Sequence, residues 1–370
     1  MDTTAAPRAP EDLLPADEPV RFVTEDGADS PAESRYPRPS VDRLREAYRR
    51  MVLGRRYDVQ VNALTKQGKL AVFPSALGQE ACQIAAALAL GEDDWLFPTY
   101  RDGMALVARG LDPAEVLVML RGTWHCGYDP RATHTAPQCA PLATQIPQAV
   151  GMADALRRTG GNRVVMAFIG DGGTSEGDFH EGLNFAAVFR APVVFLVQNN
   201  GYAISVPLAK QSAAPSLAHK GVGYGIPSER VDGNDLVAVL AVLDHAVARA
   251  RSGAGPFLVE ARTYRMEAHT SADDATRYRD QAEVDRWRAA DPVERLERYL
   301  SGTGALSDAD IAADRAAAEE FATGLRERMS TEPTVEPIEM FQHVYARPTR
   351  QLMAQRAALS AELDEREAAR

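Results

Sequence analysis

The chain has 370 residues, a formal net charge of −11 at pH 7 and 45% hydrophobic side chains. This length suffices for a large buried core, and the acidity excludes nucleic acid and anionic membranes as main partners. No stretch approaches the roughly 18 apolar residues of a membrane span, and the three cysteines show neither disulfide-rich nor CxxC spacing, so we expect a reducing cytoplasm.

The first elements in chain order are a tail and two helices. Residues 1–40 are acidic and rich in proline, a composition that predicts a mobile N-terminal arm. Residues 41–56 have the spacing of an amphipathic helix, and residues 79–90 have that of a more buried helix. We therefore expect the folded region to begin near residue 41.

Strands and helices then alternate as far as about residue 265. The expected strands are short apolar runs, at 95–97, 163–169, 191–198, 229–231 and 257–264. The expected helices are 145–158, 176–189 and a third that Asn234 caps and that runs to Arg251. Alternating elements of this kind indicate an α/β fold built on a parallel sheet.

The remainder of the chain, from about residue 290, reads as helix that ends in 352–370. We expect three parts: the arm at 1–40, one α/β domain at 41–300, and a C-terminal helical extension at 301–370. In this reading a parallel-sheet domain is wrapped by N- and C-terminal helices.

Polar residues follow two neighbouring strands of the expected sheet. Gly-Asp-Gly at 170–172 closes one strand, and Asn199 and Asn200 close the next after a helix, with 26 residues between the two motifs. The carboxyl ends of parallel strands meet at one edge of a sheet, where ligands bind. We therefore expect Asp171 and the two asparagines to lie within a few ångströms of each other.

Two common phosphate-binding designs do not fit this stretch. A dinucleotide fingerprint needs GxGxxG and an acidic residue at the end of the next strand, whereas the next strand here ends in amides. A Walker loop needs a lysine after its last glycine, and Asp178 stands at that position. An ordinary βα turn followed by an Asn-Asn-Gly turn is the remaining alternative without a ligand.

Magnesium that holds a diphosphate fits the same residues better. Asp171 offers a carboxylate, Asn200 an amide oxygen, and Tyr202 a backbone carbonyl, all hard oxygen ligands of the kind that Mg²⁺ takes alongside phosphate oxygens. The glycines beside Asp171 allow the backbone to approach a phosphate, and the following helix N-terminus favours an anion.

The pattern GDG, 26 residues, NN resembles the thiamine diphosphate-binding motif. More broadly, residues 43–300 resemble the alpha subunit of the first, decarboxylating component of 2-oxo acid dehydrogenase complexes. The resemblance rests on LFPTYRDG (96–103), APLATQIPQAVG (140–151), VQNNGYAIS (197–205) and YRMEAHTSADDATRYR (264–279). It implies a thiamine diphosphate-binding fold with thiamine diphosphate and Mg²⁺ as cofactors.

The resemblance also implies roles for individual residues. Asp171, Asn200 and the Tyr202 carbonyl would hold Mg²⁺, and Leu142 would support the aminopyrimidine ring. The cofactor diphosphate would be bound by Tyr100, Arg101, Gly170, Gly172 and Gly173. Branched-chain members hold a potassium ion at the stretch equivalent to 139–145, but here Cys139 and Ala140 replace the usual serines. Gln198 stands where some relatives have an arginine.

Two histidines are candidates for chemistry. His269 lies in a polar loop after a strand, and the histidine of this loop in the family sits beside the cofactor and assists acyl transfer to the lipoyl group. A side chain that titrates near neutrality suits such proton transfer. His125 is a second candidate, although its neighbour Trp124 is equally consistent with a packed structural residue. Arg265, Asp273 and Tyr278 are expected to order the loop.

The implied activity is oxidative decarboxylation of a 2-oxo acid with acyl transfer to a lipoyl carrier. We expect a branched-chain substrate such as 3-methyl-2-oxobutanoate, with pyruvate as the main alternative and acetoin or a non-catalytic scaffold subunit as others. The expected partners are a beta subunit in an α₂β₂ heterotetramer and a lipoyl acyltransferase core. The beta subunit is required because residues outside the single predicted sheet cannot form a second α/β domain.

Overall fold

The computed structural model describes residues 12–331 and 335–369. The chain divides into two compact units, one ending at Met329 and one running from Ser330 to Arg370. No helix in the described ranges is long and apolar enough to cross a membrane. The division into domains at 40 and 300 stays a prediction.

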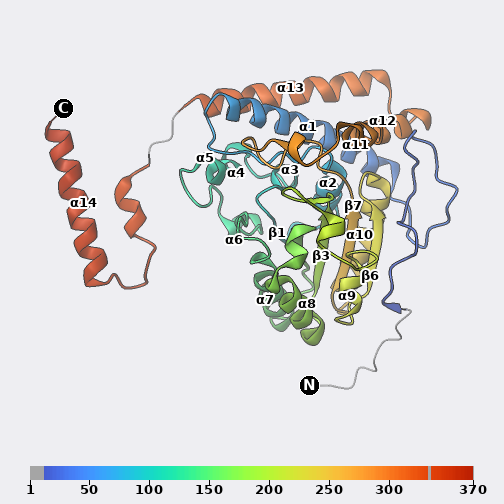
Figure 1. The fold of residues 1–370 in the computed structure, drawn as a ribbon, viewed down its shortest axis with the longest axis horizontal. Helices are drawn as coiled ribbons and strands as arrows, with labels where there is room; N and C mark the ends of the chain where they lie inside the picture. The colour runs from blue at the N-terminus through green and yellow to red at the C-terminus, as the bar shows by residue number, and fades with distance from the viewer. Residues whose placement is uncertain (1–11, 332–334, 370) are drawn as a thin grey trace. The chain divides into compact units, whose positions relative to one another are not determined.

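A five-stranded parallel sheet forms the centre of the first unit, with strand order β1-β2-β3-β7-β6 (Figure 1). The strands are β1 (Trp95–Phe97), β2 (Val165–Gly170), β3 (Val193–Asn199), β6 (Ser228–Asp232) and β7 (Phe257–Arg262). This arrangement confirms the expected α/β parallel-sheet fold. Strand β7 returns between β3 and β6, so the carboxyl ends of β1, β2, β3 and β7 are neighbours.

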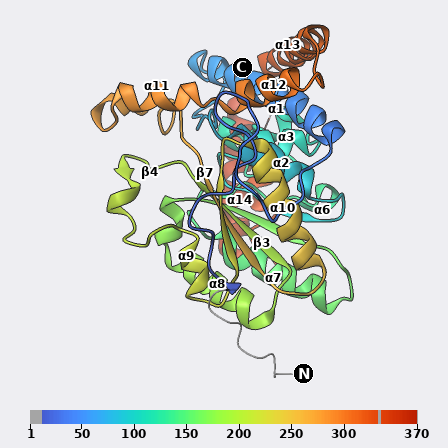
Figure 2. The ribbon, with the colours of Figure 1, turned by 90° about the vertical axis from the view of Figure 1, so that its right-hand side faces the viewer.

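Helices cover both faces of the sheet, and the central strands β2 and β3 are accordingly apolar up to the polar residues that close them. Alternate residues of β2 face opposite layers: Met166 and Phe168 pack in the cluster that includes α2 (Glu80–Ala89) and α10 (Leu236–Arg251). Ala167 and Ile169 pack instead in the cluster with α7 (Gln145–Arg158) and α8 (Gly177–Phe189). Figure 2 shows the two layers after a quarter turn. The sheet is therefore rigidly held on both sides of the edge where the motifs emerge.

The remaining helices are divided between the two units, and the last of them belongs to the second unit. In chain order they are α1 (Val41–Lys66), α3 (Gly103–Ala108), α4 (Pro113–Val116), α5 (Val118–Arg121), α6 (Pro130–Thr133), α7 (Gln145–Arg158), α8 (Gly177–Phe189), α9 (His219–Val222), α11 (Gln281–Ala289), α12 (Pro292–Gly302), α13 (Asp308–Ser330) and α14 (Arg350–Ala368). Short 3₁₀ turns occupy Gly172–Ser175, Leu208–Lys210, Ala275–Arg277 and Pro337–Phe341. A two-stranded hairpin, β4 (Tyr202–Ala203) with β5 (Val206–Pro207), follows β3.

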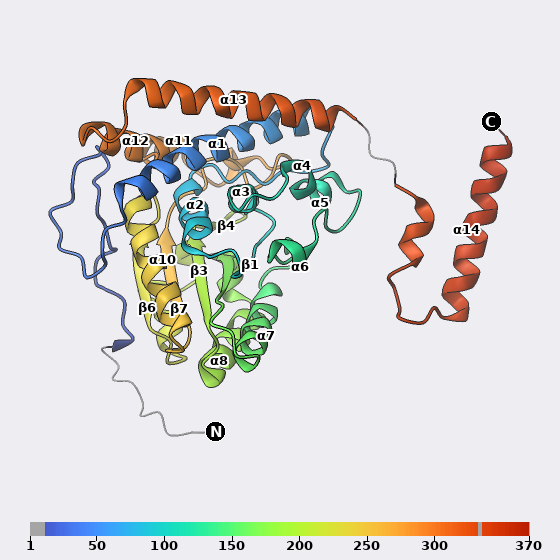
Figure 3. The same ribbon diagram turned by 180° about the vertical axis from the view of Figure 1, so that it is seen from behind.

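Helices α1 and α13 lie side by side, as Figure 3 shows from behind. Leu325 and Met329 of α13 share a buried cluster with Tyr57 and Val61 of α1. Glu319 of α13 also pairs with Arg56 of α1 at 2.7 Å. These contacts explain why α1 continues to Lys66 rather than ending near residue 56, since its second half has an apolar partner that sequence periodicity did not show.

The N-terminal segment differs from the mobile arm that we expected. Residues 1–11 lie outside the described residues, but residues 12–40 are packed. Phe22 and Val23 are buried, and their backbone N–H groups donate to Asp235 Oδ2 at 2.6 and 2.8 Å. The carboxylate of Glu229 accepts hydrogen bonds from Arg35 and Tyr36 at 2.6 and 2.7 Å. The composition of this segment predicted disorder, because its apolar residues are few and are separated by prolines and acidic residues.

Chain segments outside the strands cover both edges of the sheet. At the β6 edge, Val20 pairs in parallel with Val231 as an isolated bridge, its N–H donating to the Arg230 carbonyl at 2.9 Å. At the β1 edge, Thr135 pairs with Leu96, and the Ala136 N–H donates to the Leu96 carbonyl at 2.8 Å. The backbone groups of both outer strands thus have partners in this chain.

The cap of α10 also differs from expectation. Asp235, not Asn234, is the N-cap, and its Oδ1 accepts from Val237 N at 3.0 Å and Ala238 N at 3.2 Å. The Asn234 amide is used elsewhere, donating to the Ala290 carbonyl at 2.8 Å. Both residue types are good caps, so the choice depended on tertiary contacts.

Candidate active site

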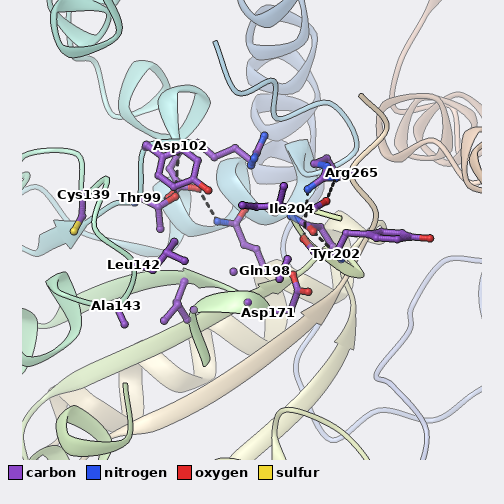
Figure 4. A pocket seen from close by; sticks show the side chains of 18 of the residues that line it. Thr99, Asp102, Cys139, Leu142, Ala143, Asp171, Gln198, Tyr202, Ile204 and Arg265 are labelled. Carbon is purple, nitrogen blue, oxygen red and sulfur yellow. Dashed lines mark hydrogen bonds between the residues drawn. The ribbon is translucent and has the colours of Figure 1, made fainter. Parts of the chain in front are cut away.

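A pocket of about 220 Å³ opens at the carboxyl ends of β1, β2, β3 and β7. The turn after β1 supplies Thr99 to Asp102, and the turn after β2 supplies Gly170 to Gly173. The segment after β3 supplies Asn200 to Ile204, and the segment after β7 supplies Arg265 and His269. Figure 4 shows these side chains from close by. The two motifs therefore meet at one edge of the sheet.

Asp171 lies at the bottom of this pocket and is 1% exposed. Its Oδ2 accepts a hydrogen bond from Gln211 Nε2 at 2.7 Å. Burial raises the pKa of Asp171, while Gln211 and the backbone N–H of Asn200 act in the opposite direction. A buried carboxylate without a basic partner at bonding distance is costly, and a cation at this position would offset that cost.

The glycines beside Asp171 are required by packing. A Cβ at Gly172 would lie 2.6 Å from the Ala203 Cβ, and one at Gly173 would lie 2.7 Å from the Ile169 Cγ1. Gly170 has open space instead, with no atom within 4 Å of such a Cβ. The backbone of this turn is thus pressed against β2 and β4, and the open side at Gly170 borders the pocket.

The three residues predicted as metal ligands all line the pocket. Besides the Asp171 carboxylate, Asn200 Oδ1 accepts from the Tyr202 N–H at 3.3 Å, and the Tyr202 carbonyl accepts from Arg265 at 3.4 Å. Both contacts are long, so each oxygen retains acceptor capacity. Among the described residues no group of three His, Cys, Asp or Glu side chains is placed to hold a metal. A cation here would depend on ligand oxygens to complete its shell.

Tyr100 and Arg101 line the opposite wall of the pocket. Arg101 is 7% exposed, and its guanidinium donates to the Ser75 carbonyl at 2.7 Å and the His269 carbonyl at 3.0 Å. These two carbonyls fix the plane of the guanidinium. Such a fixed cation is suited to an anionic group such as a phosphate.

His269 lies next to two guanidinium groups. Its Nδ1 is 3.1 Å from Arg101 Nη2 and 3.3 Å from Arg265 Nη1. Burial and these two cations lower the pKa of His269 to about 4, with Asp273 acting weakly in the opposite direction. Because arginine can only donate, Nδ1 is the acceptor and the proton of the neutral ring is on Nε2.

The loop that carries His269 is ordered by the residues expected to do so. Asp273 accepts from the His269 N–H at 2.8 Å and from the Tyr278 hydroxyl. Arg265 donates to the Tyr278 hydroxyl at 3.0 Å and to the Ile204 carbonyl at 2.6 Å. Arg265 is also part of the pocket wall, which the sequence did not indicate.

Exposed apolar side chains line part of the pocket. Leu142 is 46% exposed and Ile204 is 55% exposed. Ile204 has φ +56°, and Ala143, also in the pocket, has φ +66°. Positive φ is rare for residues with a Cβ and rarest for β-branched ones, so the backbone is strained at two points of one pocket. The side chains offer an apolar surface to the uncharged part of a ligand.

Of two further sequence candidates, one lies apart from this arrangement and the other borders it. The structure does not bring His125 into the pocket: it is exposed, in the loop between α5 and α6, with its ring centroid 5.0 Å from that of Trp124. Four residues of the stretch 139–145 line the pocket: Cys139, Leu142, Ala143 and Gln145. The Cys139 thiol donates to the Pro141 carbonyl at 3.0 Å.

The sequence is similar to known enzymes along most of its length. Residues 48–322 match the family model of the dehydrogenase E1 component. The chain is 48% identical over 347 residues to the 3-methyl-2-oxobutanoate dehydrogenase subunit alpha of Mycobacterium tuberculosis, covering 94% of both chains. It is 38% identical over 328 residues to the pyruvate dehydrogenase E1 component subunit alpha of Acholeplasma laidlawii, covering 87% of this chain and 94% of that protein. The same-named protein of Staphylococcus aureus is 40% identical over 273 residues, 74% of each chain.

Proposed function

This chain belongs to the dehydrogenase E1 component family, and from that membership we propose that it is the alpha subunit of a 3-methyl-2-oxobutanoate dehydrogenase. Such an enzyme decarboxylates a branched-chain 2-oxo acid oxidatively and transfers the acyl group to a lipoyl carrier. The observation that carries the proposal is the pocket at the sheet edge, where Asp171, Asn200 and the Tyr202 carbonyl face Arg101 and His269.

The pocket fits the diphosphate end of thiamine diphosphate with Mg²⁺. Asp171, Asn200 and the Tyr202 carbonyl would hold the metal, Arg101 and Tyr100 would bind diphosphate oxygens, and the backbone at Gly170, Gly172 and Gly173 would border them. Leu142 would support the aminopyrimidine ring. The cofactor, when bound, supplies a nucleophilic carbon and an electron sink for decarboxylation.

Two side chains of the protein, Arg101 and His269, would neutralise phosphate charge and supply a proton. Arg101 neutralises phosphate charge from a position fixed by two carbonyls. His269 presents Nε2–H, since its Nδ1 faces Arg101 and Arg265, and so acts as a hydrogen-bond or proton donor to an anion that forms beside it. We propose that it assists acyl transfer to the lipoyl group. His125, as a second catalytic residue, stays a prediction.

The site is half of a catalytic centre. The described residues form a single large sheet, and it carries the diphosphate-binding motif. A glutamate that activates the aminopyrimidine ring would therefore come from another polypeptide, a beta subunit in an α₂β₂ heterotetramer docked on a lipoyl acyltransferase core. The three cysteines are free thiols, which supports a reducing cytoplasm as the compartment.

Expression of this chain with and without its beta subunit tests the proposal. We expect the single chain to be inactive and the complex to decarboxylate 3-methyl-2-oxobutanoate faster than pyruvate. Turnover by the purified single chain would contradict the half-site. Preference for pyruvate would favour the second candidate, which the relatives with 38% and 40% identity support. A complex that binds no thiamine diphosphate would indicate a scaffold subunit.

A further inference from the structure

A chain of hydrogen-bonded side-chain amides runs from Asn200 to Asp102 along the lining of the pocket. Asn200 Nδ2 donates to Gln79 Oε1 at 3.0 Å, and Gln79 Nε2 donates to Gln198 Oε1 at 3.1 Å. Gln198 Nε2 then donates to Asp102 Oδ1 at 2.7 Å, a bond visible in Figure 4. The four residues come from four places: the segments after β3 and β1, β3 itself and the start of α2.

Asp102 determines which group donates and which accepts in each hydrogen bond of this amide chain. Its Oδ2 accepts from Thr99 N and Thr99 Oγ1, both at 2.6 Å, and its Oδ1 also accepts from Gln83 Nε2 at 3.2 Å. A carboxylate only accepts, so Gln198 has to present its NH₂ group to Asp102 and its oxygen to Gln79. Gln79 must then turn its NH₂ to Gln198 and its oxygen to Asn200.

The orientation of the Gln79 amide fixes the orientation of the Asn200 amide. Because Asn200 donates to Gln79 Oε1, its NH₂ group points away from the pocket floor and its Oδ1 lies on the opposite side of the amide. The four side chains line the pocket but belong to residues that are only 0–6% exposed, so a reversed amide would have little access to water. A reversal would place two acceptors or two donors face to face in the interior, at the cost of an unmade buried hydrogen bond.

We propose that Gln79 and Gln198 are positioning residues that fix the Asn200 amide so that its oxygen, not its NH₂ group, is presented to the divalent cation. The proposal rests on the proposed function, since that function places the cation between Asp171 and Asn200. It also gives Gln198 a role without a phosphate contact, because its side chain is used by Gln79 and Asp102. Hydrogen-bond partners of metal ligands commonly change metal affinity by about 10–100-fold when they are removed.

The test interrupts the amide chain and then restores its direction with different groups. Gln198→Met removes the oxygen that accepts from Gln79, so the Gln79 amide can turn and no longer holds Asn200 in one orientation. We expect the apparent Kd for Mg²⁺, measured by calorimetry on the complex with saturating thiamine diphosphate, to rise by at least about tenfold.

The rescue is the double variant Gln198→Glu with Asp102→Asn, which exchanges the amide and the carboxylate. The carboxylate introduced at position 198 accepts from Gln79, and the amide introduced at position 102 can donate to that carboxylate. Gln83 Nε2 loses its acceptor at position 102 in this variant and keeps the Arg101 carbonyl as its acceptor. The donor-to-acceptor direction of the amide chain and the total charge of its residues are both kept. The double variant should therefore bind Mg²⁺ within about threefold of the wild-type Kd, well below the change expected for the interrupted chain.

Gln83→Met is the matched control. Gln83 also donates to Asp102 but lies outside the amide chain, so its loss should lower the melting temperature of the apoprotein without changing the Kd for Mg²⁺. If Gln198→Met does not fold, Gln79→Met removes the acceptor of the Asn200 amide directly, and the same rise in Kd is expected.

Unchanged Mg²⁺ affinity in a folded Gln198→Met or Gln79→Met variant would overturn the proposal, as would a folded double variant that binds Mg²⁺ as weakly as Gln198→Met. A wild-type complex that binds neither Mg²⁺ nor thiamine diphosphate fails at an earlier step. That result would overturn the proposed function, so the two failures are distinguishable.

Discussion

His269 Nδ1 lies 3.1 Å from the guanidinium of Arg101, the residue placed to bind an anion. One arginine thus contacts both the ligand side of the pocket and the candidate proton donor. Loss of positive charge at Arg101 would change the protonation of His269 as well as anion binding. The first prediction follows from this coupling.

We expect His269 to remain neutral in the unliganded protein at physiological pH. Burial, Arg101 and Arg265 lower its pKa to about 4, so its NMR signal should not titrate between about pH 5.5 and 8. The folded pKa is below the ordinary value of 6.5, so the contribution to stability is complete above 6.5 and is lost as pH falls toward 4. Arg101→Met should raise the His269 pKa measurably. A midpoint near the ordinary value in the wild type would contradict this prediction.

A second prediction concerns Asp171→Asn. Removing the carboxylate should weaken Mg²⁺-dependent binding of thiamine diphosphate by at least about 100-fold, since one charged metal ligand is lost.

The same variant should also change stability. Burial raises the pKa of Asp171, so its ionised form destabilises the folded apoprotein as pH rises. The variant should therefore melt at a higher temperature than wild type at neutral pH without cofactor. Titration calorimetry and thermal melting check both parts, with Asp178→Asn as control; a lower melting temperature together with unchanged affinity would refute it.

The third prediction separates two steps of the reaction. If His269 assists acyl transfer, His269→Ala should lose about 10²–10⁴-fold in the assay with lipoyl carrier. Decarboxylation measured with an artificial electron acceptor should fall far less. An equal loss in both assays would place His269 in decarboxylation, and no loss would make it structural. His125→Ala, measured in parallel, tests the predicted second catalytic residue, and no loss in either assay would make His125 structural.

The fourth prediction concerns stability. Asp235→Ala removes the cap of α10 and leaves the buried N–H groups of Phe22 and Val23 without their acceptor. Together these losses should lower the free energy of unfolding by about 2–4 kcal/mol. The comparison variant Asp244→Ala removes a partly exposed pair with Arg43 and should cost under about 1 kcal/mol. Urea denaturation measures both, and similar values for the two variants would rule out the proposed anchoring of the N-terminal segment.

Strong local patterns predicted the fold well. Each expected strand lies within about two residues of an observed one, because buried parallel strands are short apolar runs with clear ends. The pocket floor was also predictable, since the carboxyl ends of β2 and β3 bring Asp171 and Asn200 together by topology alone. Family resemblance added Arg101 and His269, which lie after β1 and β7 and are distant in sequence.

Features that depend on tertiary contacts were not predictable. The amides of Gln79 and Gln198 meet only because the start of α2 lies beside β3, and neither side chain has a signal of its own in the sequence. Ile204 has φ +56°, a value that a β-branched residue adopts only when its surroundings enforce it. The contacts of segment 12–40 were missed because its apolar residues are too few to show a period, although Phe22 and Val23 among them are buried.

The covered edges of the sheet restrict how other chains can join it. Val20 occupies the outer side of β6, and Thr135 occupies that of β1. A partner therefore cannot associate by strand addition, and assembly has to use helices and loops, including the rim of the pocket. A recombinant form that begins at residue 41 would lack Val20 and present a bare β6, which is a recognised cause of edge-to-edge aggregation.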